Sequence, residues 1–332
     1  MDGGVFAILG ASGCGKSMTL KCIAGIERPD EGRIVLNDRV LFDSKKKINL
    51  PPQKRKVGYM FQDYALFPNM NVVQNIQAGM GRKPDKKKVQ EYITGFQLTG
   101  LETHMPDQLS GGQKQRVAMA RMLAAEPELL LLDEPFAALD SYLKWKMEQQ
   151  MMDLLKDIQK PALFVSHSRD EVYRLCDTVS CINQGKMEVI EPVKEFFKNP
   201  KTKTAALLSG CKNICSVELV KDLEPDKSFG KLWAAEWGVA FDVSKEALTA
   251  HTVGIRAHYL MQKKPKEGHI TELTVGEYRI LEDPFEWNIS FRKDENCEWL
   301  QWKISKSDWN PSMGVPKVLY VREEDLLLLD RE

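Results

Sequence analysis

One segment near the start of the chain constrains its fold most strongly. Residues 10–17 read GASGCGKS, which fits the pattern GxxxxGK[ST], and the apolar residues 5–9 precede them. Residues 18–24 place apolar side chains at near-helical spacing. A strand, a glycine-rich loop and a helix in this order point backbone N–H groups at phosphate oxygens. The segment therefore predicts an α/β nucleotide-binding domain, in which Lys16 neutralises the β- and γ-phosphates and Ser17 coordinates Mg²⁺. The residues expected to contact ATP here are Gly10, Ala11, Ser12, Gly13, Cys14, Gly15, Lys16 and Ser17.

A second segment supplies two carboxylates. Residues 129–132 are four leucines, and Asp133 and Glu134 follow them. A continuous apolar run of this length is typical of a central parallel strand that is buried on both faces. Ligands bind at the carboxyl ends of such strands. We therefore expect Asp133 to hold Mg²⁺ through water and Glu134 to polarise the attacking water.

Strand-like and helical patterns alternate along the first two thirds of the chain. A hairpin is predicted around Asn37 and Asp38, and helices over about 141–159 and 169–175 flank a strand at 162–166. This alternation favours a largely parallel sheet covered by helices. The lysine- and arginine-rich tracts at 45–47, 54–56 and 86–88 are interpreted as solvated surface, with contact to a membrane partner or anionic lipid as the alternative.

The composition excludes several classes of protein. The chain of 332 residues has 47 Lys and Arg against 47 Asp and Glu, so it has no overall attraction for nucleic acid. No apolar run approaches the ~20 residues of a membrane span, and we expect no secretory signal. Seven cysteines without a CxxC pair indicate reduced thiols in the cytosol. Because six of the seven tryptophans follow residue 211, together with short β-rich runs, residues 211–332 are predicted to form a separate, mostly-β domain.

A third segment narrows the function. Ser110 is followed by Gly111, Gly112 and Gln113 at the start of a predicted helix, which is another anion-binding N-terminus. A single phosphate loop does not need a second such site, whereas a dimer does, because each protomer can then close the nucleotide of the other. At this point the chain resembles the ATP-binding subunit of an ABC transporter.

This resemblance extends over residues 5 to about 210 and implies further roles. Gln62 matches the glutamine that contacts Mg²⁺ and senses the membrane partner, and His167 matches the switch histidine that contacts the γ-phosphate. Glu134 and His167 are thus the catalytic pair, and Ser17, Gln62 and Asp133 are the Mg²⁺ residues. The residues implied to contact ATP from the partner protomer are Ser110, Gly111, Gly112, Gln113 and Asp140.

The resemblance also implies an architecture. It is a P-loop cassette over residues 1–210, with a mostly parallel RecA-like sheet, a helical subdomain over about 63–125, and an OB-like β domain after it. Such cassettes usually begin with an antiparallel strand pair and an aromatic residue that stacks on adenine. This chain starts almost at the phosphate loop, so we expect those strands to be missing and ATP to bind more weakly.

The implied function is ATP hydrolysis coupled to import. A single cassette without membrane helices, followed by a β domain, is similar to importer ATPases, and residues 40–44, 50–53, 64–68 and 209–214 resemble molybdate importers most. Sulfate, polyamine, iron and sugar importers share much of this sequence. A soluble ABC ATPase that acts on nucleic acid or protein assemblies is the alternative from another class of protein. The expected partners are a second copy, integral-membrane permease subunits and, indirectly, a substrate-binding protein, at the cytoplasmic face of the membrane. No nucleic acid is expected.

Overall fold

The computed structural model describes residues 4–81, 83–137, 141–220 and 229–329. The chain divides into two compact units, Met1–Val193 and Lys194–Glu332. Within the described ranges, no helix is both long and apolar enough to cross a membrane.

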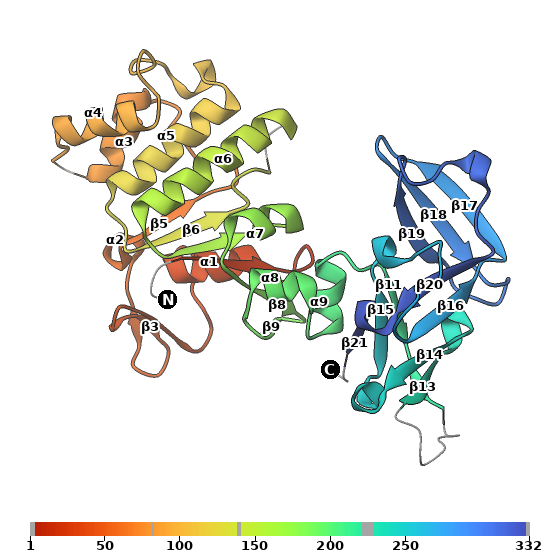
Figure 1. The fold of residues 1–332 in the computed structure, drawn as a ribbon. Helices are drawn as coiled ribbons and strands as arrows, with labels where there is room; N and C mark the ends of the chain where they lie inside the picture. Colours follow the sequence, from red (N-terminus) through yellow and green to blue (C-terminus); the bar gives the residue numbers. More distant parts are fainter. Residues whose placement is uncertain (1–3, 82, 138–140, 221–228, 330–332) are drawn as a thin grey trace. The chain divides into compact units, whose positions relative to one another are not determined.

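The first unit is built from alternating strands and helices (Figure 1). Its strands are β1 (Val5–Leu9), β2 (Arg33–Leu36), β3 (Arg39–Asp43), β4 (Ile48–Asn49), β5 (Val57–Met60), β6 (Leu129–Asp133), β7 (Ala162–Val165), β8 (Thr178–Asn183), β9 (Lys186–Met187) and β10 (Glu191–Pro192). Its helices are α1 (Lys16–Ala24), α2 (Pro52–Arg55), α3 (Val72–Met80), α4 (Lys86–Gly95), the 3₁₀ turn η1 (Pro106–Gln108), α5 (Gly111–Ala124), α6 (Ser141–Ile158) and α7 (Arg169–Leu175).

The central sheet of this unit is mostly parallel, as the leucine run predicted. Its strands lie in the order β10-β8-β1-β7-β6-β5, and β9 pairs with β8. Strands β8, β1, β7, β6 and β5 run parallel, whereas β9 and β10 are antiparallel to β8. The carboxyl ends of β1, β7 and β6 therefore meet at one edge, where Asp133 ends β6 and where the phosphate loop and His167 follow β1 and β7.

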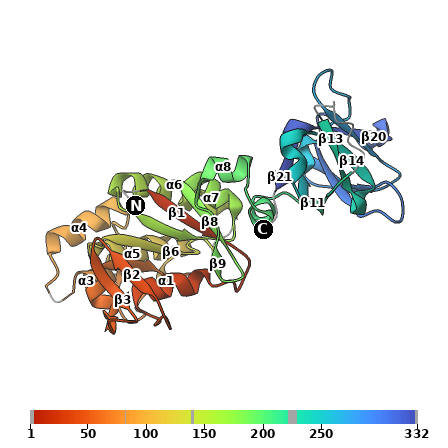
Figure 2. The ribbon, with the colours of Figure 1, turned by 90° about the horizontal axis from the view of Figure 1, so that it is seen from below.

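Successive residues of each buried strand face opposite sides of the sheet. On one side, Phe6 and Ile8 of β1 form a core with Leu20 of α1 and with Leu131 and Val165 of the neighbouring strands. Figure 1 shows α1 beneath the sheet and α6 above it, and Figure 2 shows the β2–β3 hairpin on the same side as α1. Both faces of the sheet are covered, which explains why its strands are apolar along their whole length.

Two local predictions are confirmed and one is wrong. Asn37 and Asp38 have φ of 47° and 61° and connect β2 to β3, as the two-residue turn required. Helices α6 and α7 occupy the predicted ranges. The basic tract at 54–56, by contrast, is not entirely surface: Arg55 is completely buried, because its guanidinium lies against the end of α1.

The helices α3, α4 and α5 form a small core of their own. Buried side chains from the three helices pack together, among them Ile76, Ile93 and Val117. Asn71 and Ser110 form capping boxes with Gln74 and Gln113, so that the side chains fix where α3 and α5 begin. These helices lie within the range predicted for the helical subdomain.

The second unit is mostly β. Its strands are β11 (Asn213–Ser216), β12 (Glu218–Leu219), β13 (Phe229–Ala234), β14 (Val239–Ser244), β15 (Thr252–Ile255), β16 (Ile270–Thr274), β17 (Glu277–Glu282), β18 (Glu286–Arg292), β19 (Leu300–Ser305), β20 (Val318–Arg322) and β21 (Leu326–Leu329). They form small antiparallel sheets in the orders β11-β15-β21, β12-β13-β14, β16-β20 and β17-β18-β19. Trp237, Trp302 and Trp309 lie in its core.

The second unit begins earlier than residue 211. Helix α8 (Val193–Lys198) starts at the division, and α9 (Lys203–Leu208) belongs to the second unit. Ala206 of α9 packs with Cys211, Leu327 and Leu329. The buried Arg256 donates hydrogen bonds to the carbonyl and hydroxyl oxygens of Ser209. The boundary from the sequence was therefore placed too late, because α9 packs on the C-terminal strands.

Candidate functional site

The loop after β1 has the backbone that a phosphate cradle requires. A Cβ atom on Gly10 would lie 2.6 Å from Cys14 Sγ and 2.8 Å from the Ile182 carbonyl oxygen, so a side chain at this position has no space. Gly13 and Gly15 have φ of 80° and 105°, a region that favours glycine. A Cβ on either would meet no atom within 4 Å, so this side of the loop is open.

Lys16 is the buried cation of the loop. Its side chain is 4% exposed, and Nζ donates hydrogen bonds to the carbonyl oxygens of Gly10 (2.9 Å) and Ala11 (2.8 Å). A buried ammonium group needs such acceptors because water no longer solvates it. The loop therefore holds the Lys16 ammonium group at its own backbone, where phosphate oxygens would be alternative acceptors.

Asp133 lies beside the loop and is held from two sides. Ser17 Oγ donates to Asp133 Oδ1 at 2.8 Å, and the Tyr59 hydroxyl donates to Asp133 Oδ2 at 2.7 Å. Burial, together with the hydrogen bond and the charge of Asp133, raises the pKa of Tyr59 far above its usual value, so the phenol keeps its proton. The joint role of Ser17 and Asp133 was predicted from the sequence. A role for Tyr59 was not predicted, although Tyr59 lies three residues before Gln62.

Glu134 and His167 contact each other. Glu134 Oε1 is in contact with His167 Nε2, and the two residues follow the adjacent strands β6 and β7. Glu134 has a φ of 47°, which is unusual for a side chain of this size and costs on the order of 1 kcal/mol. Its N–H donates to the Val165 carbonyl oxygen at 2.9 Å, which anchors this turn to β7. The two predicted catalytic residues are thus brought together.

A buried network beneath His167 fixes the turn on which it lies. Ser166 Oγ donates to Glu171 Oε2 at 2.6 Å and accepts from Ser168 N at 2.9 Å. Glu171 is 4% exposed and also forms an ion pair with Lys144 of α6. Sequence reasoning missed Ser166, Glu171 and Lys144. The sequence signals for them are weak: Ser166 precedes His167, Glu171 lies in the helix that follows it, and Lys144 lies in the helix before it.

The remaining predicted residues are not in contact with this cluster in the part of the chain that the structure describes. Gln62 is exposed, two residues beyond the end of β5. Ser110 Oγ accepts from Gln113 N at 3.4 Å, and Gln113 Oε1 accepts from Ser110 N at 2.8 Å. Gly111 and Gly112 form the first turn of α5. Asp140 lies outside the described residues. The roles of these residues in a partner's site stay predictions.

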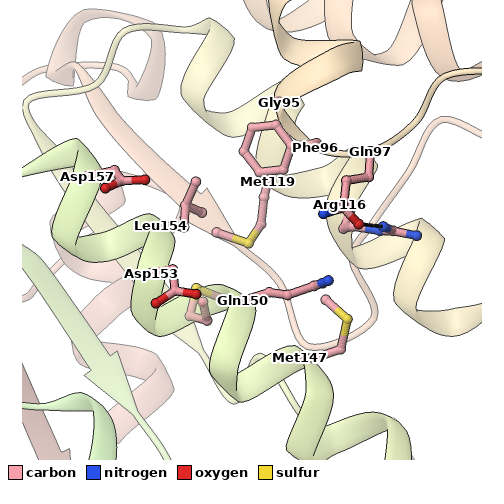
Figure 3. A pocket seen from close by; sticks show the side chains of 11 residues that line it. Gly95, Phe96, Gln97, Arg116, Met119, Met147, Gln150, Asp153, Leu154 and Asp157 are labelled. Carbon is pink, nitrogen blue, oxygen red and sulfur yellow. Dashed lines mark hydrogen bonds between the residues drawn. The ribbon is translucent and has the colours of Figure 1, made fainter.

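The phosphate loop is an exposed surface and not a closed pocket. Ala11, Ser12 and Gly13 are all exposed. The cavity in Figure 3, of about 200 Å³, lies elsewhere, between the end of α4, α5 and α6. It is lined by Phe96, Met119 and other side chains, and no predicted ATP residue contributes to it. A nucleotide on this loop would therefore remain open to water unless another surface covered it.

The donors present fit Mg²⁺ and a triphosphate. Mg²⁺ prefers oxygen ligands and is usually bound by one or two protein groups together with substrate phosphates. A hydroxyl and a carboxylate, from Ser17 and Asp133, are in contact here. This pair of groups fits the mode in which phosphate oxygens supply further ligands of the ion.

Several known proteins are similar to part of this chain. The ABC transporter family model matches residues 1–137. The chain is 42% identical over 216 residues to the Fe(3+) ions import ATP-binding protein FbpC of Haemophilus influenzae (strain 86-028NP), an alignment that covers 63% of this chain and 60% of the relative. It is 45% identical over 197 residues to the Molybdenum import ATP-binding protein ModC of Yersinia pestis bv. Antiqua (strain Antiqua), covering 58% of this chain and 54% of the relative.

The chain thus spans at most about 60% of the length of these curated relatives. Among solved structures, a dimeric ATP-binding cassette in a post-hydrolysis state, bound to ADP and Pi, is 28% identical with a TM-score of 0.49; the match covers 58% of this chain and 87% of that chain. The strand order, the phosphate loop and the family match together lead to one conclusion. Residues 1–137 match the ABC transporter family, and the unit that contains them has the P-loop fold.

Proposed function

We propose that this chain is the ATP-hydrolysing subunit of an ABC importer, which couples ATP binding and hydrolysis to the uptake of a small oxyanion, molybdate. The observation on which this rests most is the joint placement of two pairs at one edge of the sheet. Ser17 and Asp133 are hydrogen-bonded, and Glu134 and His167 are in contact. This is the arrangement needed to bind a metal-complexed phosphate next to a base.

Each residue has a distinct role in this proposal. Lys16 would exchange its carbonyl acceptors for the β- and γ-phosphate oxygens. Ser17 and Asp133 would hold Mg²⁺, and the bound ion would neutralise charge on the phosphates. Glu134 accepts a hydrogen bond from the attacking water and so orients it. His167, next to Glu134, donates to the γ-phosphate and stabilises the charge that develops there.

The exposed loop supports a dimer as the active form. Two copies facing each other would cover both nucleotides, with Ser110, Gly111, Gly112, Gln113 and Asp140 of each copy contacting the nucleotide of the other. Excluding water strengthens the electrostatic interactions of the site and prevents premature exchange of the reactants. The chain would be attached to the cytoplasmic face of the membrane through permease subunits, docked near Gln62, and would meet a substrate-binding protein only indirectly.

The choice of molybdate is supported by the names of several similar proteins, while another relative is named for Fe(3+) import. The cassette residues act on ATP and not on the transported substrate, so the geometry of the site favours neither. Iron is therefore the second candidate. Uptake of labelled molybdate and of Fe(3+) by cells with and without this chain distinguishes the two: molybdate uptake must fall when the chain is removed.

ATP hydrolysis by the purified full-length chain tests the proposal, with Glu134→Gln as the diagnostic variant. General base catalysis contributes roughly a hundredfold or more, so Glu134→Gln should lose most turnover yet still bind ATP. It should accumulate as a dimer with ATP in size-exclusion chromatography. Asp170→Asn is the matched control, since its carboxylate is 67% exposed at the start of α7.

Two results would contradict the proposal. Turnover of Glu134→Gln at the rate of the unaltered chain would remove Glu134 from the role of base. Stimulation of hydrolysis by nucleic acid or a soluble protein assembly, without any stimulation by or copurification of a membrane permease, would favour the non-transport ABC ATPase.

A further inference from the structure

The carboxylate of Asp133 has two hydrogen-bond donors, and only one of them belongs to the phosphate loop. Ser17 donates to Oδ1 and Tyr59 donates to Oδ2, with donor–acceptor distances of 2.8 and 2.7 Å. The side chain of Asp133 is 7% exposed, so little water is available to replace either donor. The terminal torsion of an aspartate is broad, and a second donor restricts it.

The position of Tyr59 follows from the register of two parallel strands. Tyr59 of β5 pairs with Leu131 of β6, and both contribute to the core on the α1 side of the sheet. Because side chains alternate along a strand, Asp133 faces the same side as Leu131. The Tyr59 ring also packs against Phe61, with ring centroids 4.5 Å apart, which limits its rotation.

We infer that Tyr59 is a positioning residue for the metal site: its hydroxyl holds the Asp133 carboxylate so that the other oxygen faces Ser17, the residue with which Asp133 would hold Mg²⁺. This inference rests on the proposed function. Tyr59 does not touch the reactants itself.

Loss of the hydroxyl has two opposing consequences. Without a second donor, Asp133 must be ordered when the metal binds, which weakens binding. Donation by Tyr59 also disperses negative charge on the carboxylate, and losing it would strengthen the attraction for a cation. A water molecule entering the vacated space would restore that donation but not the fixed direction. The loss of orientation therefore dominates, and the metal should bind more weakly.

Binding of Mn²⁺ in the presence of ATP measures this directly. The experiment compares Glu134→Gln with Glu134→Gln/Tyr59→Phe, because neither hydrolyses ATP quickly, and follows bound Mn²⁺ by electron paramagnetic resonance. A hydrogen bond to a charged group is strong, so we expect the Mn²⁺ dissociation constant to rise roughly threefold to tenfold. With the Glu134 side chain retained, Tyr59→Phe should raise the Mg²⁺ concentration for half-maximal hydrolysis by a similar factor and leave the rate at saturating Mg²⁺ little changed.

Two other tyrosines provide matched controls. The Tyr64 hydroxyl is buried and has no hydrogen-bond partner among the described residues. The Tyr92 hydroxyl donates to the Leu123 carbonyl oxygen at 3.1 Å, in the small helical core. Tyr64→Phe removes a hydroxyl that forms no hydrogen bond among the described residues, and Tyr92→Phe removes one that does. Both variants should leave Mn²⁺ binding unchanged.

An unchanged or tighter Mn²⁺ dissociation constant in the Tyr59→Phe background would overturn the inference. If that variant does not fold, Tyr59→Met, which also lacks the hydroxyl, takes its place under the same criterion. Absence of ATP-dependent Mn²⁺ binding by the Glu134→Gln chain itself would instead refute the proposed function, and the role of Tyr59 with it. The two failures are therefore distinguishable.

Discussion

Arg55 fixes the end of the helix that begins at the phosphate loop. Its side chain is completely buried, and Nη1 donates to the carbonyl oxygens of Cys22 (2.7 Å) and Ile23 (2.9 Å) in the last turn of α1. The same guanidinium donates to the Leu50 carbonyl oxygen and to Asn49 Oδ1, each at 2.7 Å. One side chain thus satisfies helix-end carbonyls and ties them to the segment before β5.

Arg55→Met removes these donors while retaining much of the apolar stem. Buried acceptors that lose a partner cost about 1–3 kcal/mol each, and the contributions are not additive. The favourable charge at the carboxyl end of α1 contributes on the order of a further 0.5–1 kcal/mol. Water that reaches the site would satisfy some of the carbonyl oxygens, and the Met side chain would fill much of the space of the Arg55 stem, so both would reduce the loss of stability. We therefore expect the free energy of unfolding of the first unit to fall by about 3 kcal/mol.

Equilibrium urea unfolding followed by helical circular dichroism measures this loss, because the long helices lie in the first unit. Tryptophan fluorescence provides an internal control, since six of the seven tryptophans lie beyond residue 211, and it should change little. Arg33→Met is the matched variant: Arg33 is 59% exposed and lies 3.7 Å from Asp43, so it should cost at most about 0.5 kcal/mol. A fall in the free energy of unfolding below about 1 kcal/mol for Arg55→Met would refute the reasoning, because it would mean that the carbonyl oxygens bound by Arg55 form other hydrogen bonds in the variant.

Two further predictions concern pH and turnover. Burial raises the pKa of Tyr64 from its usual value near 10 to about 12, so the folded state favours the neutral phenol. The free energy of unfolding of the unaltered chain should fall by roughly 2 kcal/mol because of this residue as the pH rises from 10 to 12. Urea titrations over this pH range should show that Tyr64→Phe lacks this part of the loss. Equal pH profiles of the two proteins would contradict the prediction. Glu171→Gln breaks the ion pair to Lys144 and weakens the support of the turn of His167. It should lower kcat for ATP roughly threefold to tenfold with KM nearly unchanged, whereas an unchanged kcat would show that His167 does not depend on this support.

Much of the fold could be predicted because short-range patterns determine it. The phosphate loop, the turn at Asn37 and Asp38, and the leucine strand each combine residues that are adjacent in sequence with a known conformational preference. Ser17 and Asp133 could also be paired before the structure, since the carboxyl ends of parallel strands lie at one edge. The mostly-β nature of the second unit followed from its composition and short β-rich runs.

Features that depend on strand register or on a distant partner could not be predicted. Arg55 lies in a basic tract whose neighbours Lys54 and Lys56 are exposed, and only its contact with the end of α1 distinguishes it. Tyr59 meets Asp133 across 74 positions of sequence, through a register that no local pattern encodes. The boundary between the two units was misplaced for a related reason, because α9 packs against strands at the far end of the chain.

In the proposed dimer, the phosphate loop of one protomer and the start of α5 of the other would contact the same nucleotide. These two parts differ in whether their polar groups are already engaged. In the phosphate loop, Gly13 and Gly15 leave open space, and the ammonium group of Lys16 donates to groups of the loop itself, the carbonyl oxygens of Gly10 and Ala11 and the Cys14 sulfur. At the start of α5, the side chain of Ser110 and the backbone N–H of Gln113 already satisfy each other. A phosphate from a partner protomer would therefore have to compete with an intact capping box, which contributes about 1 kcal/mol to the helix. In the proposed dimer, the open loop would therefore bind nucleotide first, and closure by the second protomer would then have to offset the loss of the Ser110 cap.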